Sequence, residues 1–240
     1  MKTPLILLLL LGAALAPAFA GPSEEDACFK PTTKNPAGVV KACSVLLQRP
    51  ILTPEWKLQA LFNRGRAHVV ARDLDLAIAD FSTIIQLAPE NKIGWEARAS
   101  AYASKGDFLR AQRDTNTLLG MAPGDAKLLN NSCWLHAALK QFDAAMADCR
   151  KSLALAPGRV ETLDSLGFTE LGRRNYRQAM TAYNAALAID PRHAASLYVR
   201  GVIKRRMGDM TGGNKDMTEA GKIDPEIAEY YAPYGLTQGN

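Results

Sequence analysis

Apolar residues recur at the spacing of an amphipathic helix, in segments of the chain that each stop near a proline. One such segment has apolar residues at Leu76, Ile78, Ile84 and Leu87 and is followed by Pro89. Proline disfavours a helical residue before it and lacks an N–H donor, so it indicates the end of a helix. Five of these prolines follow one another at intervals of 34 residues, at Pro89, Pro123, Pro157, Pro191 and Pro225. A fixed period of this size predicts a repeat architecture.

Small and large residues also keep fixed places within this period, and the large residues at position 4 are Leu61, Trp95, Leu129, Leu163 and Leu197. When the count starts at Leu58, the proline stands at position 32, and the residues at positions 8 and 20 are small in every unit. Two antiparallel helices approach closely only where the facing side chains are short, so each unit is predicted to be a packed pair of helices. Position 8 holds Gly65, Ala99, Cys133, Gly167 and Gly201, and position 20 holds Ala77, Ala111, Ala145, Ala179 and Gly213.

A turn is predicted near the middle of each unit, where Asp or Asn stands in segments such as Gly106-Asp107 and Arg174-Asn175. Either side chain can cap the second helix by accepting from its first N–H groups. The fifth unit departs from the pattern, because Gly212 and Gly213 open its second helix and each glycine costs about 1 kcal/mol relative to alanine in a helix. We therefore expect this last hairpin to fray or to pack loosely.

The period and its small, large and proline positions resemble the tetratricopeptide repeat. The resemblance implies an all-α fold over residues 58–227, a right-handed solenoid of five helical hairpins with an N-terminal capping helix. Residues 21–57 are expected to form that cap with a partial repeat, because "VVKACSVLLQ" from Val39 reads like the second helix "AIADFSTIIQ" from Ala77. Helices are expected to start at Asn35-Pro36 and at Thr53-Pro54. Residues 228–240 are expected to form a polar tail whose tyrosines can dock onto the final hairpin.

The N-terminus is interpreted as a secretory signal peptide over residues 1–20. Lys2 precedes an uninterrupted apolar run at residues 5–16, and Ala18-Phe19-Ala20 is typical of a signal peptidase site. The alternative is a membrane anchor, but the run of 12 residues falls short of the about 20 needed to span a bilayer. We therefore predict an exported protein, periplasmic in a Gram-negative source and otherwise secreted, with no membrane span in the mature chain.

Composition and charge narrow the classes of function. The chain of 240 residues is 48% hydrophobic and 22% charged and has a net charge of +5, an ordinary balance for a globular protein. So weak a positive charge, together with export, argues against a nucleic-acid partner. We find no nucleophile with its base, no phosphate-binding loop and no zinc-binding helix in the sequence. We therefore expect that the protein is not an enzyme, has no cofactor and takes no small-molecule substrate.

Four cysteines in an exported chain suggest disulfides, and four cysteines allow three connectivities. Positions 8 and 24 face each other within a hairpin of the resembled family, which implies the pairs Cys28–Cys43 and Cys133–Cys149. The alternative is buried free thiols that pack as small apolar groups.

Cys133 and His136 lie one helical turn apart and Cys149 can face them, but a structural zinc site usually needs a fourth ligand. No fourth candidate stands nearby, so no metal site is predicted and His136 is interpreted as a packing residue.

In the resembled family, the first helix of each hairpin lines a concave groove. Trp134 and Phe168 share position 9 of adjacent units and are expected to be neighbours there, where aromatic rings and amides suit a peptide. We therefore predict an adaptor that binds a protein or peptide partner in this groove. Alternatives are that the two rings only pack helix against helix, or that the protein is a structural subunit of a cell-envelope assembly that uses an edge or the convex face. The predicted groove residues are Phe62, Asn63, Arg66, Lys127, Asn130, Asn131, Trp134, Asp164, Phe168, Tyr198 and Arg205.

Overall fold

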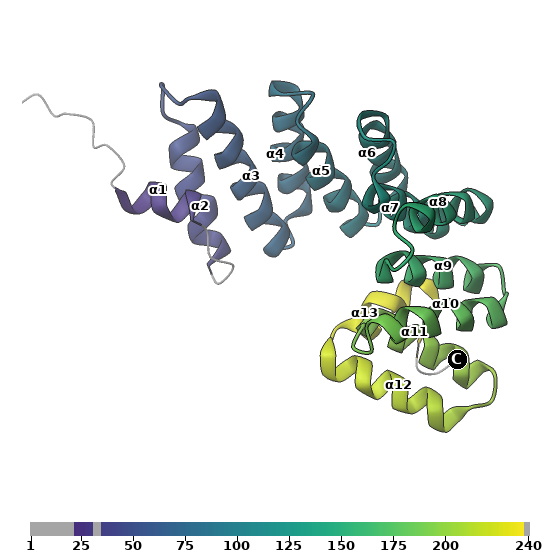
Figure 1. The fold of residues 1–240 in the computed structure, drawn as a ribbon. Coiled ribbons are helices and arrows are strands. Elements are labelled where there is room, and N and C mark those ends of the chain that lie inside the picture. Colours follow the sequence, from purple (N-terminus) through teal and green to yellow (C-terminus); the bar gives the residue numbers. More distant parts are fainter. Residues whose placement is uncertain (1–21, 31–34, 238–240) are drawn as a thin grey trace, which may run out of the picture. The chain divides into compact units, whose positions relative to one another are not determined.

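The computed structural model describes residues 22–30 and 35–237, and these residues form thirteen α-helices and one short 3-10 helix (Figure 1). The predicted signal peptide at 1–20 lies outside the described residues. Two compact units divide the chain, residues 1–80 and residues 81–240, and each is considered by itself. The boundary falls inside α4, so the first unit holds α1 to α3 and the start of α4.

The helices follow one another as antiparallel pairs, which confirms the predicted all-α fold of stacked hairpins. Each second helix from α4 onward ends two residues before one of the five prolines, as the period predicts. The pairs are α1 (Pro22–Phe29) with α2 (Pro36–Leu47), α3 (Pro54–Val70) with α4 (Leu74–Leu87), α5 (Lys92–Ser104) with α6 (Phe108–Met121), α7 (Ala126–Ala138) with α8 (Phe142–Leu155), α9 (Val160–Gly172) with α10 (Tyr176–Ile189), and α11 (Ala194–Arg206) with α12 (Met210–Ile223). The chain then forms α13 (Ile227–Tyr231) and the 3-10 helix η1 (Ala232–Tyr234).

The turn inside each full hairpin places its position 15 in the left-handed region of the backbone. The φ angle is positive at Gly106 (79°) and Gly208 (94°), and also at Arg72, Lys140 and Arg174. The predicted caps follow in part. Asp107 accepts from the N–H of Arg110 (3.1 Å) and Asp209 from that of Gly212 (2.8 Å), whereas Asn175 makes no side-chain cap and instead donates to Glu170 (2.7 Å).

The small residues of the period lie where the two helices of a hairpin touch. Ala77, Ala111, Ala145 and Ala179 are all fully buried. In the fifth hairpin, an added Cβ at Gly201 would stand 2.8 Å from the carbonyl oxygen of Gly213, and one at Gly213 would stand 2.7 Å from that of Gly201. The two backbones therefore approach more closely than alanine allows, and the expectation that this hairpin packs loosely was wrong. The glycines weaken α12 as an isolated helix but permit its closest packing against α11.

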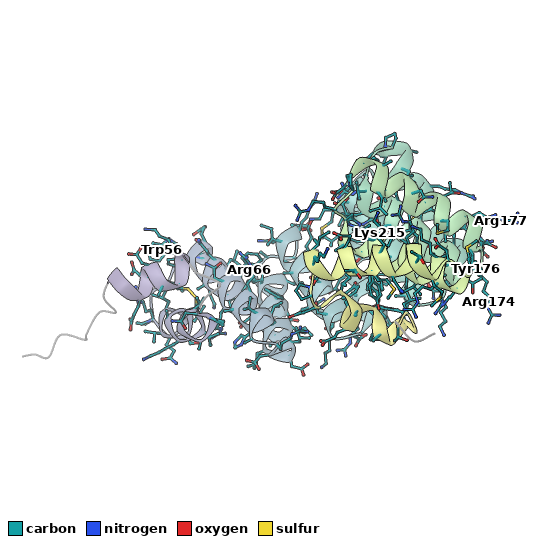
Figure 2. All side chains as sticks on the ribbon, turned by 90° about the horizontal axis from the view of Figure 1, so that it is seen from below. Trp56, Arg66, Arg174, Tyr176, Arg177 and Lys215 are labelled. Carbon is teal, nitrogen blue, oxygen red and sulfur yellow. A yellow bond between two sulfur atoms is a disulfide. The ribbon has the colours of Figure 1, made fainter. Side chains whose placement is uncertain are left out.

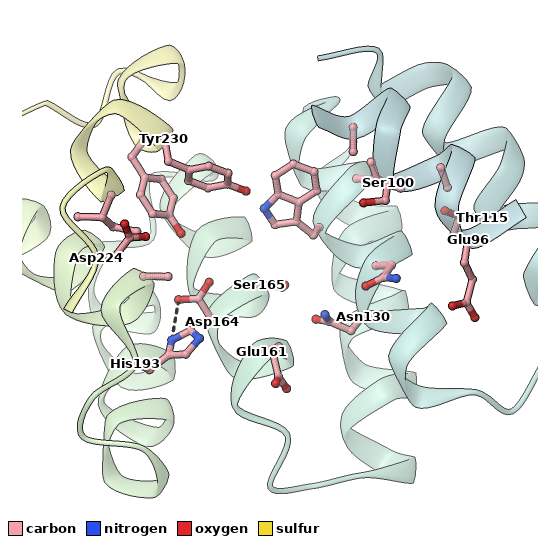
Figure 3. A pocket seen from close by; sticks show the side chains of 18 of the residues that line it. Glu96, Ser100, Thr115, Asn130, Glu161, Asp164, Ser165, His193, Asp224 and Tyr230 are labelled. Carbon is pink, nitrogen blue, oxygen red and sulfur yellow. Dashed lines mark ion pairs between the residues drawn. The ribbon is translucent and has the colours of Figure 1, made fainter. Parts of the chain in front are cut away.

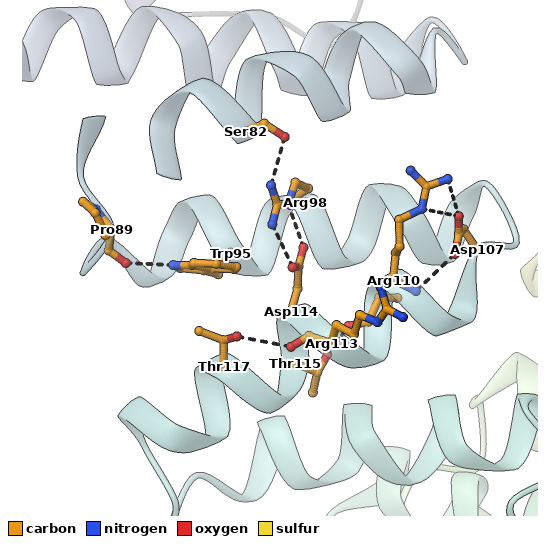
Figure 4. Close-up of polar contacts among 11 residues, drawn as sticks. Ser82, Pro89, Trp95, Arg98, Asp107, Arg110, Arg113, Asp114, Thr115 and Thr117 are labelled. Atoms are coloured by element: carbon orange, nitrogen blue, oxygen red, sulfur yellow. Dashed lines mark hydrogen bonds and ion pairs between the residues drawn. The ribbon is translucent and has the colours of Figure 1, made fainter. Parts of the chain in front are cut away.

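An arginine–aspartate pair joins the two helices in three hairpins, at positions 7 and 23 of the period. Arg98 donates twice to Asp114, at 2.8 and 2.9 Å, and its third nitrogen donates to Ser82 (3.0 Å) of the preceding helix (Figure 4). Arg200 repeats this geometry with Asp216 and Asn184. Each arginine thus ties its own hairpin to the one before it through a bidentate contact.

The compact unit of residues 1–80 has the same arginine link, and this link shows how α2 packs. Arg64 donates to Asp80 (2.9 and 2.6 Å) and to Ser44 (3.1 Å) of α2. Ser44 therefore stands where Ser82 stands relative to Arg98, so α2 packs as the second helix of a hairpin. Asn35 caps α2 and Thr53 caps α3, and a proline follows each of them, as predicted.

Both disulfides have the pairing that the resemblance implied. The Cys28–Cys43 bond joins α1 to α2, and the Cys133–Cys149 bond joins α7 to α8. All four sulfurs are buried. His136 lies on α7 with its Nδ1 at 3.0 Å from a carboxylate oxygen of Asp148.

Candidate functional site

A cavity of about 460 Å³ opens in the second unit, between the first helices of three hairpins and the C-terminal helix (Figure 3). Its walls come from α5, α6, α7 and α9 on one side, and from the start of α11, Asp224 and α13 on the other. The polar and aromatic side chains of the lining are Glu96, Ser100, Thr115, Asn130, Asn131, Trp134, Glu161, Asp164, Ser165, His193, Asp224, Tyr230 and Tyr231.

The chain's own C-terminal segment, residues 227–236, forms one end of this site. The ring of Tyr231 stacks on that of Tyr198 with centroids 5.6 Å apart, and the Tyr198 hydroxyl donates to the carbonyl oxygen of Leu236 (3.0 Å). Arg206 donates to the carbonyl oxygen of Gly235 (2.8 Å). Burial raises the pKa of Tyr231 well above its usual value, and the nearby charge of Asp164 raises it further. The segment is therefore held as part of the fold, by contacts that it makes with α11.

Tyr234 carries the segment deeper, into the predicted groove. Its ring lies 5.3 Å from that of Phe168, 6.4 Å from that of Trp134 and 6.4 Å from that of Phe108, between centroids. Trp134 in turn packs edge-on against Phe108 at 5.4 Å. The two aromatic residues predicted to be neighbours are thus brought together through a third ring from the tail.

The predicted groove residues of the second unit divide into two groups. Asn130, Asn131, Trp134 and Asp164 line the cavity. Phe168 lies on α9 and Tyr198 on α11, and the rings of Tyr231 and Tyr234 pack against them. Tyr198 is buried and Phe168 is half-buried, and direct contact of a partner with them stays a prediction.

Lys127 and Arg205 lie outside the cavity lining. Lys127 Nζ stands 3.6 Å from a carboxylate oxygen of Glu96. Arg205 turns toward α12, where a Cβ on Gly213 would meet its side chain. The position in the repeat predicted on which helix each residue lies, but it did not predict where these two long side chains point.

Phe62, Asn63 and Arg66 belong to α3 in the first unit. Asn63 is buried, and its Nδ2 donates to the carbonyl oxygen of Cys28 (2.9 Å), so it holds α1 and is not free to contact a partner. This corrects its assignment to the binding surface. The Arg66 guanidinium lies 5.7 Å from the centroid of the Phe62 ring.

The lining of the cavity is acidic. It includes the carboxylates Glu96, Glu161, Asp164 and Asp224, and no lysine or arginine is part of it. Basic side chains such as Arg174 and Arg177 instead point into solvent at the turn between α9 and α10 (Figure 2).

Asp164 is the buried member of this set. It accepts from the hydroxyl of Ser196 (2.6 Å), and His193 Nδ1 lies 3.8 Å from it. Burial raises the pKa of Asp164, and the charge of Glu161 also raises it, while Ser196 and His193 act in the opposite direction. Loss of hydration therefore disfavours the charged form of Asp164 more than Ser196 and His193 favour it.

Sequence reasoning missed Glu161, His193 and Asp224. Glu161 stands at position 2 of its 34-residue repeat, which is a groove position in the resembled family. The repeat register could therefore have predicted that Glu161 lines the cavity. His193 and Asp224 come from the connections that precede α11 and α13. Nothing in the register places such connecting residues, and their positions depend on how successive hairpins stack.

Comparison with known proteins agrees with this geometry. Residues 96–160 and 166–212 match the family model described as Tetratricopeptide repeat. Over these residues the chain is similar to tetratricopeptide-repeat proteins, a class of protein-interaction scaffolds that are typically not catalytic. No curated protein matches the chain.

Solved structures share the fold at low sequence identity. A tetratricopeptide repeat protein from Parabacteroides merdae is 21% identical, covers 87% of this chain and 84% of its own, and has a TM-score of 0.70. A thermophilic TPR protein from Thermus thermophilus is 14% identical over 74% of this chain and 97% of its own, with a TM-score of 0.63. YrrB, described as a TPR protein with an unusual peptide-binding site, is 16% identical over 81% of this chain and 99% of its own, with a TM-score of 0.51. Among residues 22–30 and 35–237, no helix is both long and apolar enough to cross a membrane.

Proposed function

We propose that the protein is an exported adaptor that holds a peptide or protein segment in the groove of its second unit. The observation that carries the proposal is the cavity of about 460 Å³ between α5, α7, α9 and α13. Its wall combines the Trp134 ring, which is only partly buried, with the exposed amide of Asn131. Aromatic rings serve as binding anchors, and amides can pair with the N–H and C=O groups of an extended chain.

Two further observations support the proposal. The repeat class is one of protein-interaction scaffolds, and YrrB has the same fold with a peptide-binding site. Two disulfides suit an oxidising compartment. The apolar run at residues 5–16 is typical of the signal peptide that would export the chain to such a compartment. Export is tested by fractionating cells and sequencing the mature N-terminus, which is expected at Gly21; a cytoplasmic chain that retains Met1 contradicts it.

Groove binding is tested by photo-cross-linking in the native envelope. A photoreactive residue replaces Asn131 inside the cavity, and a matched one replaces Ile189 at the exposed end of α10. We expect one defined adduct from position 131 only, and we expect Trp134→Ala to abolish it. An adduct that survives Trp134→Ala, or no adduct at position 131, contradicts groove binding.

The alternative is a structural subunit that uses an edge of the repeats, and one observation favours it. Position 30 is apolar in every unit and closes each second helix, and three of these side chains are about half exposed: Leu87 (49%), Leu155 (55%) and Ile189 (52%). Adducts from position 189 but not from position 131 would support this edge in place of the groove.

A further inference from the structure

The acidic cavity has no lysine or arginine in its own wall, and its one imidazole, His193, lies beside Asp164 at 3.8 Å. Glu96 and Glu161 each have one cation at 3.6 Å, Lys127 and Arg159 respectively, but neither of these basic residues lines the cavity. Three of these four side chains are more than one-third exposed, and exposed pairs of this kind are weak. Asp164 and Asp224 have no lysine or arginine among the ion pairs of the described residues. The cavity therefore presents negative charge to whatever enters it.

Asn130 supplies an independent sign that a ligand belongs here. Its side chain is 8% exposed and lines the cavity, with its amide directed between α7 and α9 (Figure 3). Its Oδ1 accepts no hydrogen bond from any described residue. Leaving such a buried acceptor unpaired is costly, and a donor brought in by a ligand would satisfy it.

The remaining lining suits the stem of a long side chain. Ala99, Ala103, Leu118 and the Trp134 ring provide apolar surface next to the carboxylates. Lysine and arginine bury their methylene stems against apolar surface while the charged head finds acceptors. The head groups carry only donors, whereas ionised carboxylates and the Asn130 carbonyl only accept. Trp134 and Tyr230 add ring faces that attract a cation.

We propose that this cavity recognises a lysine or arginine side chain of the bound polypeptide. The inference rests on the proposed groove function and names its ligand: an extended segment whose basic side chain is received by Glu161, Asp164 and Asn130. Charge complementarity selects this occupant over an acidic segment, which would meet four carboxylates and no lysine or arginine.

The test uses the purified protein and fluorescently labelled heptapeptide pools, acetylated and amidated so that their termini carry no charge. The central residue is Lys, Arg, Gln or Glu, and all other positions are the same mixture of uncharged residues. Fluorescence anisotropy is expected to give dissociation constants about tenfold lower for the Lys and Arg pools than for the Gln pool, in line with a charge-assisted hydrogen bond.

Two variants separate recognition in the cavity from general attraction. Glu161→Gln is expected to lose most of the preference for Lys and Arg, and because this side chain is 59% exposed the fold is retained, as thermal unfolding will check. Asp143→Asn is the matched control, because it removes the same charge from a side chain that is 99% exposed and, like Glu161, lies near one arginine. This variant is expected to keep the preference for Lys and Arg.

Several outcomes overturn the inference. They are equal affinity for the Lys and Gln pools, no binding of any pool, or equal loss in both variants. Failure here is distinct from failure of the proposed function. If the Gln pool binds as well as the Lys pool and cross-links at position 131, the groove still binds peptides and only the preference for a basic residue is wrong.

Discussion

The ring of Tyr234 lies edge-on to the ring of Phe168, with centroids 5.3 Å apart and planes at 86°. The two residues come from the end of the chain and from α9, and edge-to-face geometry of this kind is favourable. Through this contact the C-terminal segment fills part of the groove that a partner was expected to occupy. The surface left open is the acidic cavity beside it.

Tyr234→Ala is expected to lower the free energy of unfolding by about 1–3 kcal/mol, because it removes a partly buried ring from contacts with Phe168, Trp134 and Phe108. The same change exposes Trp134 to water, so its fluorescence emission shifts to longer wavelength. Urea unfolding and emission spectra measure the two effects. Repeating the substitution in a Trp134→Phe background is the control, since Trp56 and Trp95 should not report it; a shift that persists there contradicts the assignment.

Gly213→Ala is expected to destabilise the protein by about 1–3 kcal/mol, because the new methyl group meets the backbone of Gly201 on α11. Gly221 lies on the same helix with nothing within 4 Å of its added Cβ. Gly221→Ala should therefore stabilise by up to about 1 kcal/mol through helix propensity alone. Urea midpoints compare the pair, and equal effects of the two substitutions would rule out the close approach of α11 and α12.

Replacing both Cys133 and Cys149 by alanine is expected to cost about 3 kcal/mol of stability, because the bond closes a loop of 16 residues. Denaturant unfolding measures this cost. Intact mass before and after reduction provides the chemical check, with a gain of two hydrogens for each bridge. A chain whose mass does not change on reduction has free thiols, and the predicted cross-links are then absent.

Asp164→Asn is expected to raise stability at neutral pH and to change its pH dependence. Because burial raises the folded pKa of Asp164 above its usual value of 3.8, the native state binds more protons than the unfolded state between these two values. The wild type therefore loses stability as pH rises through this window, and the variant does not. Ser196 can still donate to the amide oxygen of the variant.

The measurement for Asp164 is the difference in unfolding free energy between variant and wild type at several pH values. The difference should be largest at neutral pH and should shrink as pH falls toward the usual value for aspartate. A difference that grows on acidification would mean that His193 stabilises the charged carboxylate more than burial opposes it.

Much of the fold was predictable because the signals that specify it are local or periodic. The prolines at position 32 follow the end of each second helix, and the small residues at positions 8 and 20 are buried in every full hairpin. The cysteine pairs were implied by the resemblance, because positions 8 and 24 face each other in a hairpin of that family. Such features depend on the chain within one unit, so 34 residues of sequence are enough to specify each of them.

The arginine–aspartate pairs show where this reasoning stopped short. Arg98 and Asp114 stand at fixed positions of the period, as do Arg200 and Asp216, so the pairing was present in the register and was overlooked. The glycines of the fifth unit show the opposite error. Helix propensity counted against Gly213, but its value depends on Gly201 across the hairpin, and packing outweighs propensity there.

By itself, the sequence determined the repeat, its helix ends and the places of its small residues, and the resemblance implied the disulfide pairs. Only the tertiary structure decided which groove residues are open. Asn63 is held by Cys28, Tyr198 is covered through Tyr231 and Leu236, and Glu161 and Asp164 meet His193 around one cavity. These relationships join residues from different repeats or from the end of the chain, and the 34-residue period does not predict them. They follow from how hairpins stack and where the last segment folds back, which is why the candidate site could not be read from the register alone.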